Sequence, residues 1–138
     1  MPLYQTQTTS FKTELPQAVH NLLTDTIKIA LYSDAATLNE DTTVYTTTNE
    51  ITGTGYTAGG KTMTGATINS SGTTAYVNFA DVIWNPASFT AAGALIYNAS
   101  KSNKSIAVLS FGGNKTASTS FKIEMPPNTI STALLRFT

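Results

Sequence analysis

Two short apolar runs separated by a polar segment constrain the fold of this 138-residue chain more than any other feature. The runs are residues 94–97 and 106–109, and the segment between them, residues 98–105, consists mainly of Asn, Ser and Lys. Each run contains aromatic or β-branched residues and stops at turn-forming residues, a pattern typical of two antiparallel strands joined by a loop. Because apolar side chains alternate onto both faces of each run, we expect this hairpin to lie between two layers or between a sheet and a neighbouring subunit.

The composition predicts an all-β protein. Only 12% of the residues are charged, which is about half the share usual for a soluble globular protein. Thr is abundant between residues 42 and 90, and its branched Cβ favours extended backbone. Roughly eight or nine segments with strand patterns follow one another at intervals of about 8–12 residues. We therefore predict a single antiparallel β-sandwich, jelly-roll-like, with one short N-terminal helix.

The individual strands and turns can be placed along the chain. Besides the central hairpin, the segments expected to form strands are residues 26–32, 61–68, 73–80, 120–125 and 133–137. Residues 82–84 are expected to form an edge strand or a packed turn. Turns or loops are expected at residues 33–41, 42–60, 69–72, 112–115 and 126–128. Apolar and charged side chains alternate most clearly around Phe121, Ile123 and Met125, which should face the core. The lone tryptophan, Trp84, is expected to fill the core.

We expect one domain preceded by an arm. Residues 1–10 are polar and are predicted to form a flexible N-terminal arm, and residues 11–138 form the β-sandwich domain. At the beginning of this domain, apolar residues recur at helical spacing and predict the short helix. Thr13 or Glu14 can open that helix, with Pro16 in its first turn.

Charge and composition argue against several kinds of partner and site. The formal net charge is zero and the eight Lys and Arg residues are scattered, whereas nucleic-acid binding needs a concentrated basic face. The absence of Cys excludes disulfides, thiolate metal sites and cysteine nucleophiles. The start of the chain lacks the basic region and apolar core of a secretory signal, and no apolar run approaches membrane-spanning length. We therefore expect neither a nucleic-acid nor a membrane partner.

Residues 55–62 match the phosphate-loop pattern G-x-x-x-x-G-K-[ST] letter for letter. That loop binds phosphate because it follows a buried strand and opens a helix, whose free N–H groups hold the phosphate. Here residues 48–52 are too polar for a buried strand, and residues 63–69 show no helical stripe. The best magnesium-binding candidate, Asp81, follows a strand pattern that a polar residue interrupts. We interpret the match as a Gly-rich bend between extended segments.

The remaining candidate site residues form no recognisable constellation. His20 is the only histidine, and no nucleophile motif accompanies it, so we expect it on the helix surface or at a sheet edge. A zinc site would need several carboxylates, and none cluster suitably. Asp34, Asn39, Glu40 and Asp41 share one loop, but they miss the calcium pattern D-x-[DN]-x-[DN]-G, so a solvated loop is preferred over an ion site. No catalytic, cofactor-binding or metal-binding residue is predicted.

Aromatic side chains raise the possibility of a carbohydrate groove. The residues concerned are Tyr32, Tyr45, Tyr56, Tyr76, Tyr97 and Trp84. Aromatic residues are also used in cores and at subunit contacts. For most of these residues we prefer core packing or subunit contact.

Several segments together resemble a small protein encoded by many tailed bacteriophages. The segments are residues 11–15 (FKTEL), 19–21 (VHN), 26–32 (TIKIALY), 53–60 (GTGYTAGG) and 93–98 (GALIYN). The similarity covers nearly the whole chain and is weakest at residues 2–10 and at the C-terminal end. Members of that group are described as hypothetical or virion structural proteins. The resemblance implies a virion component and supplies no catalytic residues to carry over.

The leading functional hypothesis is therefore a capsid decoration, or cement, protein. Such a protein would act as a homo-oligomer, expected to be a trimer, and would stabilise the shell by binding the major capsid protein or another virion protein. It would be made in the bacterial cytoplasm, reside in the virion, and bind through Tyr- and Leu-rich patches and the N-terminal arm, without enzymatic chemistry or a cofactor.

Two further hypotheses belong to other classes. A tail-associated fibre, baseplate or adaptor module keeps the virion location but lowers the copy number. A host-glycan-binding module would use exposed Tyr56 and Trp84, and a buried Trp84 would argue against it. An enzyme is the least favoured class because the sequence offers neither a nucleophile–base pair nor a metal cluster.

Overall fold

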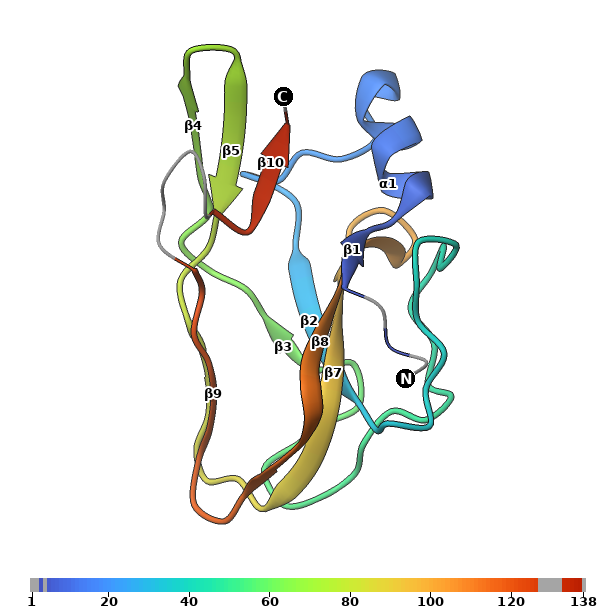
Figure 1. Cartoon of the computed structure of the whole chain (residues 1–138), viewed down its shortest axis with the longest axis vertical. Coiled ribbons are helices and arrows are strands. Elements are labelled where there is room, and N and C mark those ends of the chain that lie inside the picture. The colour runs from blue at the N-terminus through green and yellow to red at the C-terminus, as the bar shows by residue number, and fades with distance from the viewer. Residues whose placement is uncertain (1–2, 4, 127–132, 138) are drawn as a thin grey trace.

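The computed structural model describes residues 3, 5–126 and 133–137 and contains strands with one short α-helix (Figure 1). The helical elements are α1 (Thr9–Glu14) and the 3₁₀ turn η1 (Leu15–Gln17). The strands are β1 (Thr6–Gln7), β2 (Ile27–Tyr32), β3 (Lys61–Thr62), β4 (Thr67–Ser71), β5 (Thr74–Asn78), β6 (Val82–Trp84), β7 (Phe89–Asn98), β8 (Lys104–Ala117), β9 (Phe121–Ile123) and β10 (Leu135–Phe137). The prediction of a mostly β protein with one short helix is confirmed.

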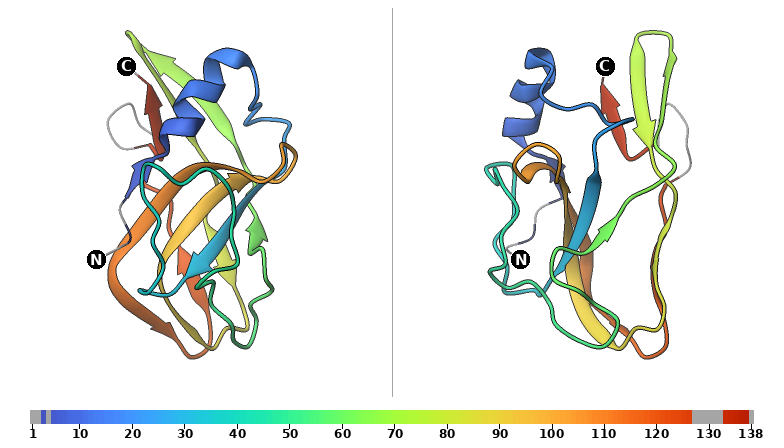
Figure 2. Two further views of the ribbon diagram at one scale, coloured as in Figure 1. Left: turned by 90° about the vertical axis from the view of Figure 1, so that its right-hand side faces the viewer. Right: turned by 180° about the vertical axis from the view of Figure 1, so that it is seen from behind.

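Three antiparallel sheets form two layers. One layer is the five-stranded sheet β1-β8-β7-β2-β3, and the other combines the sheets β10-β5-β4 and β6-β9. Figure 2 shows the two layers edge-on in its right-hand view. The main core lies between them, where side chains such as Ile29, Ile96 and Ile106 meet Val77 and Trp84 of the other layer. Burial of this apolar surface is the principal stabilising term of the fold.

The central hairpin is confirmed as β7 and β8. β7 is the middle strand of the five-stranded sheet, and its last eight residues are all buried. Residues 33–50 and Leu3 cover the face of this sheet that points away from the main core, as Figure 2 shows for residues 33–50. The chain then crosses to the other face, where Ile51 and Tyr56 join the main core. A second apolar cluster lies beneath residues 33–50, where Leu95 and Val108 pack with Leu38. The two-sided apolar pattern therefore reflects cover from the same chain.

The helix begins and ends earlier than predicted. Thr8 is its N-cap, and the Thr8 hydroxyl accepts a hydrogen bond from the Phe11 N–H. Pro16 lies in the 3₁₀ turn that follows α1, and Ala18 ends the helical segment with a φ of 59°. The prediction that Thr13 or Glu14 opens the helix is therefore wrong, because the hydroxyl that satisfies the first free N–H groups belongs to Thr8.

The turn predicted at residues 112–115 is also wrong. β8 continues through this segment to Ala117 and pairs with β7 on both sides of it. Between the pairs Gly93↔Ser110 and Ala91↔Lys115, β7 advances by two residues and β8 by five, so the glycines produce a bulge instead of a chain reversal.

Other parts of the strand prediction need smaller changes. The strand predicted at residues 61–68 is split into β3 and β4, and the turn predicted at residues 69–72 moves to Gly72 because residues 69–71 belong to β4. The predictions for β2, β5, β6, β9 and β10 are confirmed within a few residues. The predicted turn at residues 126–128 lies partly outside the described residues.

The segment predicted as an N-terminal arm is packed on the body where it is described. Thr6–Gln7 pair with β8, Leu3 is 4% exposed, and Thr8 is fully buried. Leu3 reaches Leu38 on the outer face of the sheet. The described part of residues 1–10 therefore contributes to the core.

Candidate functional site

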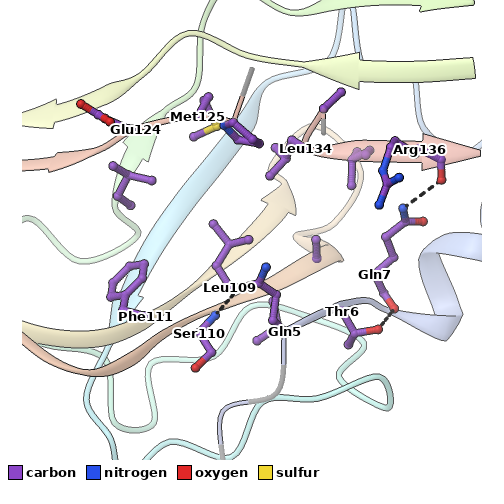
Figure 3. Close-up of a pocket in the computed structure, with 16 residues that line it drawn as sticks. Gln5, Thr6, Gln7, Leu109, Ser110, Phe111, Glu124, Met125, Leu134 and Arg136 are labelled. Carbon is purple, nitrogen blue, oxygen red and sulfur yellow. Dashed lines mark hydrogen bonds between the residues drawn. The ribbon is translucent and has the colours of Figure 1, made fainter. Parts of the chain in front are cut away.

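A groove runs along one side of the molecule where the two layers are not joined by a strand. Its larger part has a volume of about 720 Å³ and lies between β1 and β8 on one side and the segments around β9 and β10 on the other (Figure 3). A second hollow of about 470 Å³ continues it between the end of β8 and β9. The two share Phe111, Ile123 and Glu124, and we call the whole the open-side groove.

Half-buried apolar side chains form the floor of the open-side groove. Leu109 and Phe111 come from β8, and Met125 and Leu134 come from the opposite layer, as Figure 3 shows. All four pack with one side against the main core. Their remaining surface lines the groove, so the floor is apolar but rigidly held by the two layers.

Two glutamines of the N-terminal segment form hydrogen bonds in the larger part of the groove. The Gln7 Nε2 donates to the Arg136 carbonyl oxygen over 3.4 Å and so links β1 to β10 across the two layers. The Gln5 Oε1 accepts from the Ser110 N–H over 3.2 Å. Strand β1 pairs only with residues 107 and 108, so the Gln5 side chain occupies the position where a neighbouring strand would next supply a carbonyl.

The charged side chains of the groove differ in how they are paired. The Lys122 ammonium lies 3.3 Å from Glu124 and 3.6 Å from Asp81, and the hydrogen bond to Glu124 together with both negative charges raises the pKa of Lys122. Arg136 and Lys115 form no ion pair with any residue that the structure describes. In the groove, two nearby carboxylates therefore neutralise Lys122. Arg136 at one end and Lys115 at the other have no ion-pair partner among the described residues, and we call them the two unbalanced cations.

On the opposite side of the five-stranded sheet, Glu50 organises a closed hydrogen-bond cluster. Its carboxylate accepts from the Tyr45 hydroxyl over 2.6 Å, from the Gly59 N–H over 2.8 Å and from the Tyr56 hydroxyl. The Tyr97 hydroxyl donates to the Gly59 carbonyl over 2.6 Å, and its ring stacks on Tyr45 at 4.7 Å. We call these residues the Glu50 cluster, and they fasten residues 42–60 onto the sheet.

Burial in this region keeps the tyrosines protonated. It raises the pKa of Tyr97 to about 12, with a further contribution from the Glu50 charge. Burial also raises the pKa of Tyr45 and Tyr56, and their hydrogen bonds to Glu50 add to that shift. The pKa of Tyr32 is raised mainly by burial, and its hydroxyl donates to the Thr46 carbonyl. These tyrosines are neutral donors that hold the loop in place.

The residues considered for carbohydrate binding are largely internal. Trp84 is 1% exposed and packs against Phe89 and Phe121. Tyr32 is fully buried and Tyr97 is 3% exposed. The prediction that Trp84 fills the core is confirmed. Core packing, the preferred interpretation for most of the aromatic residues, is confirmed for these three, so they cannot belong to a Tyr-rich patch that faces a partner.

The phosphate-loop match has a different geometry from a phosphate site. Lys61 and Thr62 begin β3 and not a helix, and the Gly59 N–H already donates to Glu50. Gly60 has a φ of 80°, and a Cβ there would lie 1.8 Å from the Ile29 carbonyl oxygen. A Cβ on Gly55 would lie 1.9 Å from the Pro86 carbonyl oxygen. These two glycines are required by close backbone packing, which explains the pattern without a nucleotide.

His20 is not on a helix surface or at an edge, so that prediction is wrong. Its side chain is fully buried in the segment after η1. The Asn98 amide donates from Nδ2 to His20 Nδ1 over 3.0 Å and to Asp25 over 2.8 Å, while Asn98 Oδ1 accepts from the Ser100 N–H. This orientation places the ring proton on His20 Nε2, which donates to Glu14 over 2.8 Å. His20 therefore links the segment before β2 to the end of β7.

The loop of residues 34–41 is held by local hydrogen bonds. The Asn39 Oδ1 accepts from the Asp41 N–H over 2.8 Å, and the Asn39 N–H donates to the Thr42 hydroxyl. Within the described part of the chain, no group of three or more His, Asp or Glu residues could hold a metal ion. The geometry agrees with a turn-forming loop.

Comparisons with models of protein families, with curated proteins and with solved structures find no match to this chain. Among the described residues, no helix is long and apolar enough to cross a membrane.

The sequence did not identify the open-side groove or the role of Glu50. The apolar residues of the groove floor carry the same strand pattern as the core. Only the arrangement of the layers distinguishes the half-buried side chains from the fully buried ones. Glu50 lies between polar residues and has no motif around it.

Proposed function

We propose that this chain is a bacteriophage virion structural protein that decorates the capsid and stabilises the shell. In this role it holds neighbouring subunits of the major capsid protein, or of another virion protein, and it catalyses no reaction. The open-side groove is the surface that docks the partner. In this role the protein is a framework whose buried side-chain polar groups, in the part of the chain that the structure describes, are all hydrogen-bonded, and the groove supplies the apolar docking surface.

The observation that carries this proposal is the apolar floor of the open-side groove. Leu109, Phe111, Met125 and Leu134 are only half-buried, although each packs on the main core. Apolar surface that a framework holds rigidly loses little conformational freedom when a partner covers it. The resemblance of residues 26–32 and 93–98 to a virion protein group supports the same reading.

The proposal includes a description of the assembled subunit. We describe it as one jelly-roll-like sandwich that forms a homotrimer, because decorating proteins act at symmetric positions of a shell. Native mass spectrometry of the purified chain tests this oligomeric state. A monomer at the concentration found in lysates of producing cells would remove the trimer from the proposal.

The copy number per particle tests the proposal directly. Virions are purified from a phage that encodes the chain, and the protein is counted by quantitative mass spectrometry against the major capsid protein. We expect on the order of hundreds of copies per particle, because a shell repeats its positions by symmetry. We also expect particles lacking the chain to lose DNA at a lower temperature than complete particles. A chain that is missing from purified particles would overturn the proposal.

The tail-associated module remains the alternative within the virion. A count of roughly a dozen copies or fewer would assign the chain to the tail, since tail components follow the low-order symmetry of that structure. For the glycan-binding alternative, the burial of Trp84 at 1% exposure argues against the ring stacking that it requires.

A further inference from the structure

We propose that the occupant of the open-side groove is an extended segment of a partner protein with acidic residues near both of its ends. This inference rests on the proposed function in one respect, namely that the groove is a docking surface. It adds the chemistry of the partner: apolar side chains in the middle of the segment, and a carboxylate for each of the two unbalanced cations.

The first step is the charge of the groove. Arg136 lines its larger part and Lys115 lines the second hollow, and neither forms an ion pair with a described residue. Glu124 is the acid among the described lining residues, and Lys122 lies 3.3 Å from it and 3.6 Å from Asp81, which lies beside the groove. The described lining residues therefore carry three basic side chains and one acidic side chain, whereas the formal net charge of the whole chain is zero. Complementary charge on a partner would favour its docking and set its register.

The second step is the shape of the groove. The β8 residues that line it lie between Ala107 and Thr116. The bulge shortens this part of the strand, because residues 110–115 of β8 lie opposite only residues 91–93 of β7. About six strand steps of 3.3 Å therefore span it, or roughly 20 Å. A segment in extended conformation covers this length with about six or seven residues. A helix has a diameter of about 10–12 Å with its side chains, and the groove is bounded by the closely packed strands of two layers. The long and narrow outline therefore favours an extended segment.

The third step is the backbone along the rim. Beyond residue 108, β8 has no strand partner on the groove side among the described residues, and β9 pairs only with β6. The Ser110 N–H is held by the Gln5 side chain, and the Gly112 N–H donates to the Ser110 hydroxyl. Side chains thus occupy positions that a neighbouring strand's carbonyl groups would otherwise take. An extended partner can replace the Gln5 contact with its own backbone, as in strand addition at a sheet edge.

The experiment selects binders from a library of random nonapeptides displayed on yeast, using the full purified chain as bait. Enriched peptides are sequenced, resynthesised with a fluorescent label, and measured by anisotropy. We expect Asp or Glu to be enriched near both ends and apolar residues between them. Affinity should fall about ten-fold in the double variant Arg136→Gln/Lys115→Gln, since two exposed ion pairs with the peptide are lost. It should also fall as the salt concentration rises.

Two matched variants separate local chemistry from net charge. The double variant Lys12→Gln/Lys28→Gln removes the same charge from positions outside the groove, and its affinity should stay within about two-fold of the parent. The variant Arg136→Lys/Lys115→Arg keeps both charges and should bind like the parent. Equal losses in the groove and control variants would overturn the proposal.

Other outcomes would also overturn it. These are enrichment of peptides without an acidic bias and no enrichment over the input library. A third is concentration-dependent dimerisation that the groove variant abolishes, because the occupant would then be a second copy of the chain.

The measurement of peptide binding does not depend on which proteins the virion contains, so it is separate from the test of the proposed function. If acidic peptides bind but virions lack the chain, the proposed function fails and the groove chemistry stands. If virions contain the chain but acidic peptides do not bind, the proposed function stands and the inference about the occupant of the groove fails.

Discussion

The two sides of the central hairpin differ in how the chain treats its polar and apolar groups. On the outer face, residues 33–50 cover the sheet, and the Glu50 cluster satisfies the hydroxyl groups of Tyr45 and Tyr97 beneath them. On the groove side, apolar side chains stay half-buried, and two cations lack ion-pair partners among the described residues. No buried side-chain nitrogen or oxygen in the described part of the chain lacks a hydrogen bond. The half-buried apolar floor and these two cations thus lie together on the groove side, whereas exposed apolar side chains such as Val44, Ile68 and Ile83 are scattered over other parts of the surface.

This difference separates what stabilises the fold from what is available for a partner. A buried polar group stabilises a structure only when its hydrogen bonds are complete, and losing one partner leaves the other unsatisfied. Substitutions in the Glu50 cluster should therefore affect folding. Substitutions of exposed groups in the open-side groove should affect binding. Four measurements test this separation, beginning with the largest expected effect.

Replacing Glu50 by Ala should give the largest loss of stability. The change removes the acceptor for Tyr45, Tyr56 and the Gly59 N–H, and each group left unsatisfied costs about 1–3 kcal/mol. We expect the free energy of unfolding to fall by about 4 kcal/mol, measured by urea denaturation, and the Tm to fall by about 15 °C. Glu124→Ala, at an exposed acid of the groove, should stay within about 0.5 kcal/mol of the parent. Similar losses of unfolding free energy in Glu50→Ala and Glu124→Ala would show that the outer face and the groove do not differ in their contribution to stability.

The second-largest loss of stability should come from alkaline pH, which deprotonates the tyrosines of the Glu50 cluster. The pKa of Tyr97 is raised from 10.0 to about 12, so its contribution to stability is complete below pH 10 and is lost as pH rises from 10 through 12. Each pH unit in that window removes about 1.4 kcal/mol for one such tyrosine, or roughly 3 kcal/mol in all. Urea denaturation at pH 9, 10 and 11, with absorbance at 295 nm to follow tyrosinate, measures this.

The variant Tyr97→Phe serves as the control for that series. It lacks the titrating hydroxyl, so its stability should fall less steeply above pH 10 than that of the parent. Identical slopes for the two proteins would show that Tyr97 does not carry the alkaline sensitivity.

Some parts of the fold follow from local pattern, and others depend on contacts between distant residues. The alternation around Phe121 and Ile123 and the apolar runs of β7 and β8 are local signals, and the structure agrees with them. The start of α1 was placed too late because the capping hydroxyl of Thr8 lies in a segment without apolar periodicity. The glycines at 112 and 113 resemble a turn, but pairing with β7 extends β8 through them. Distant pairing overrides local preference there.

The candidate site could be predicted even less well. Leu109 and Phe111 have the alternation of core residues, and their partial exposure depends on the absence of a strand beside them. His20 looked like a surface residue, and only the fold brings Asn98 and Glu14 to its two nitrogens. A sequence pattern reports which side chains are apolar or titratable. It does not report which layer edges stay uncovered, and this decides where a partner can bind.

Acid should weaken the fold at Asp25, a half-buried carboxylate outside the Glu50 cluster. Burial alone would raise the pKa of Asp25, but hydrogen bonds from Asn98, the Asn21 N–H and Lys101 lower it from 3.8 to about 2. The stability that Asp25 provides is therefore present above pH 4 and is lost as pH falls to 2, amounting to roughly 2 kcal/mol. Urea denaturation of Asp25→Asn should give a less stable protein at pH 7 that approaches the parent near pH 2. A constant difference across this range would contradict the prediction.

The smallest effect on folding should come from Arg136→Gln in the groove. The Arg136 side chain is exposed and forms no ion pair with a described residue, and the hydrogen bond from Gln7 reaches only its backbone carbonyl. We expect the free energy of unfolding to change by less than about 0.5 kcal/mol, while binding to purified particles that lack the chain weakens several-fold. Urea denaturation and co-sedimentation with such particles measure the two quantities on the same preparation. A large loss of stability would mean that Arg136 belongs to the framework, and the distinction between the two sides of the hairpin would then fail at the residue where it should be clearest.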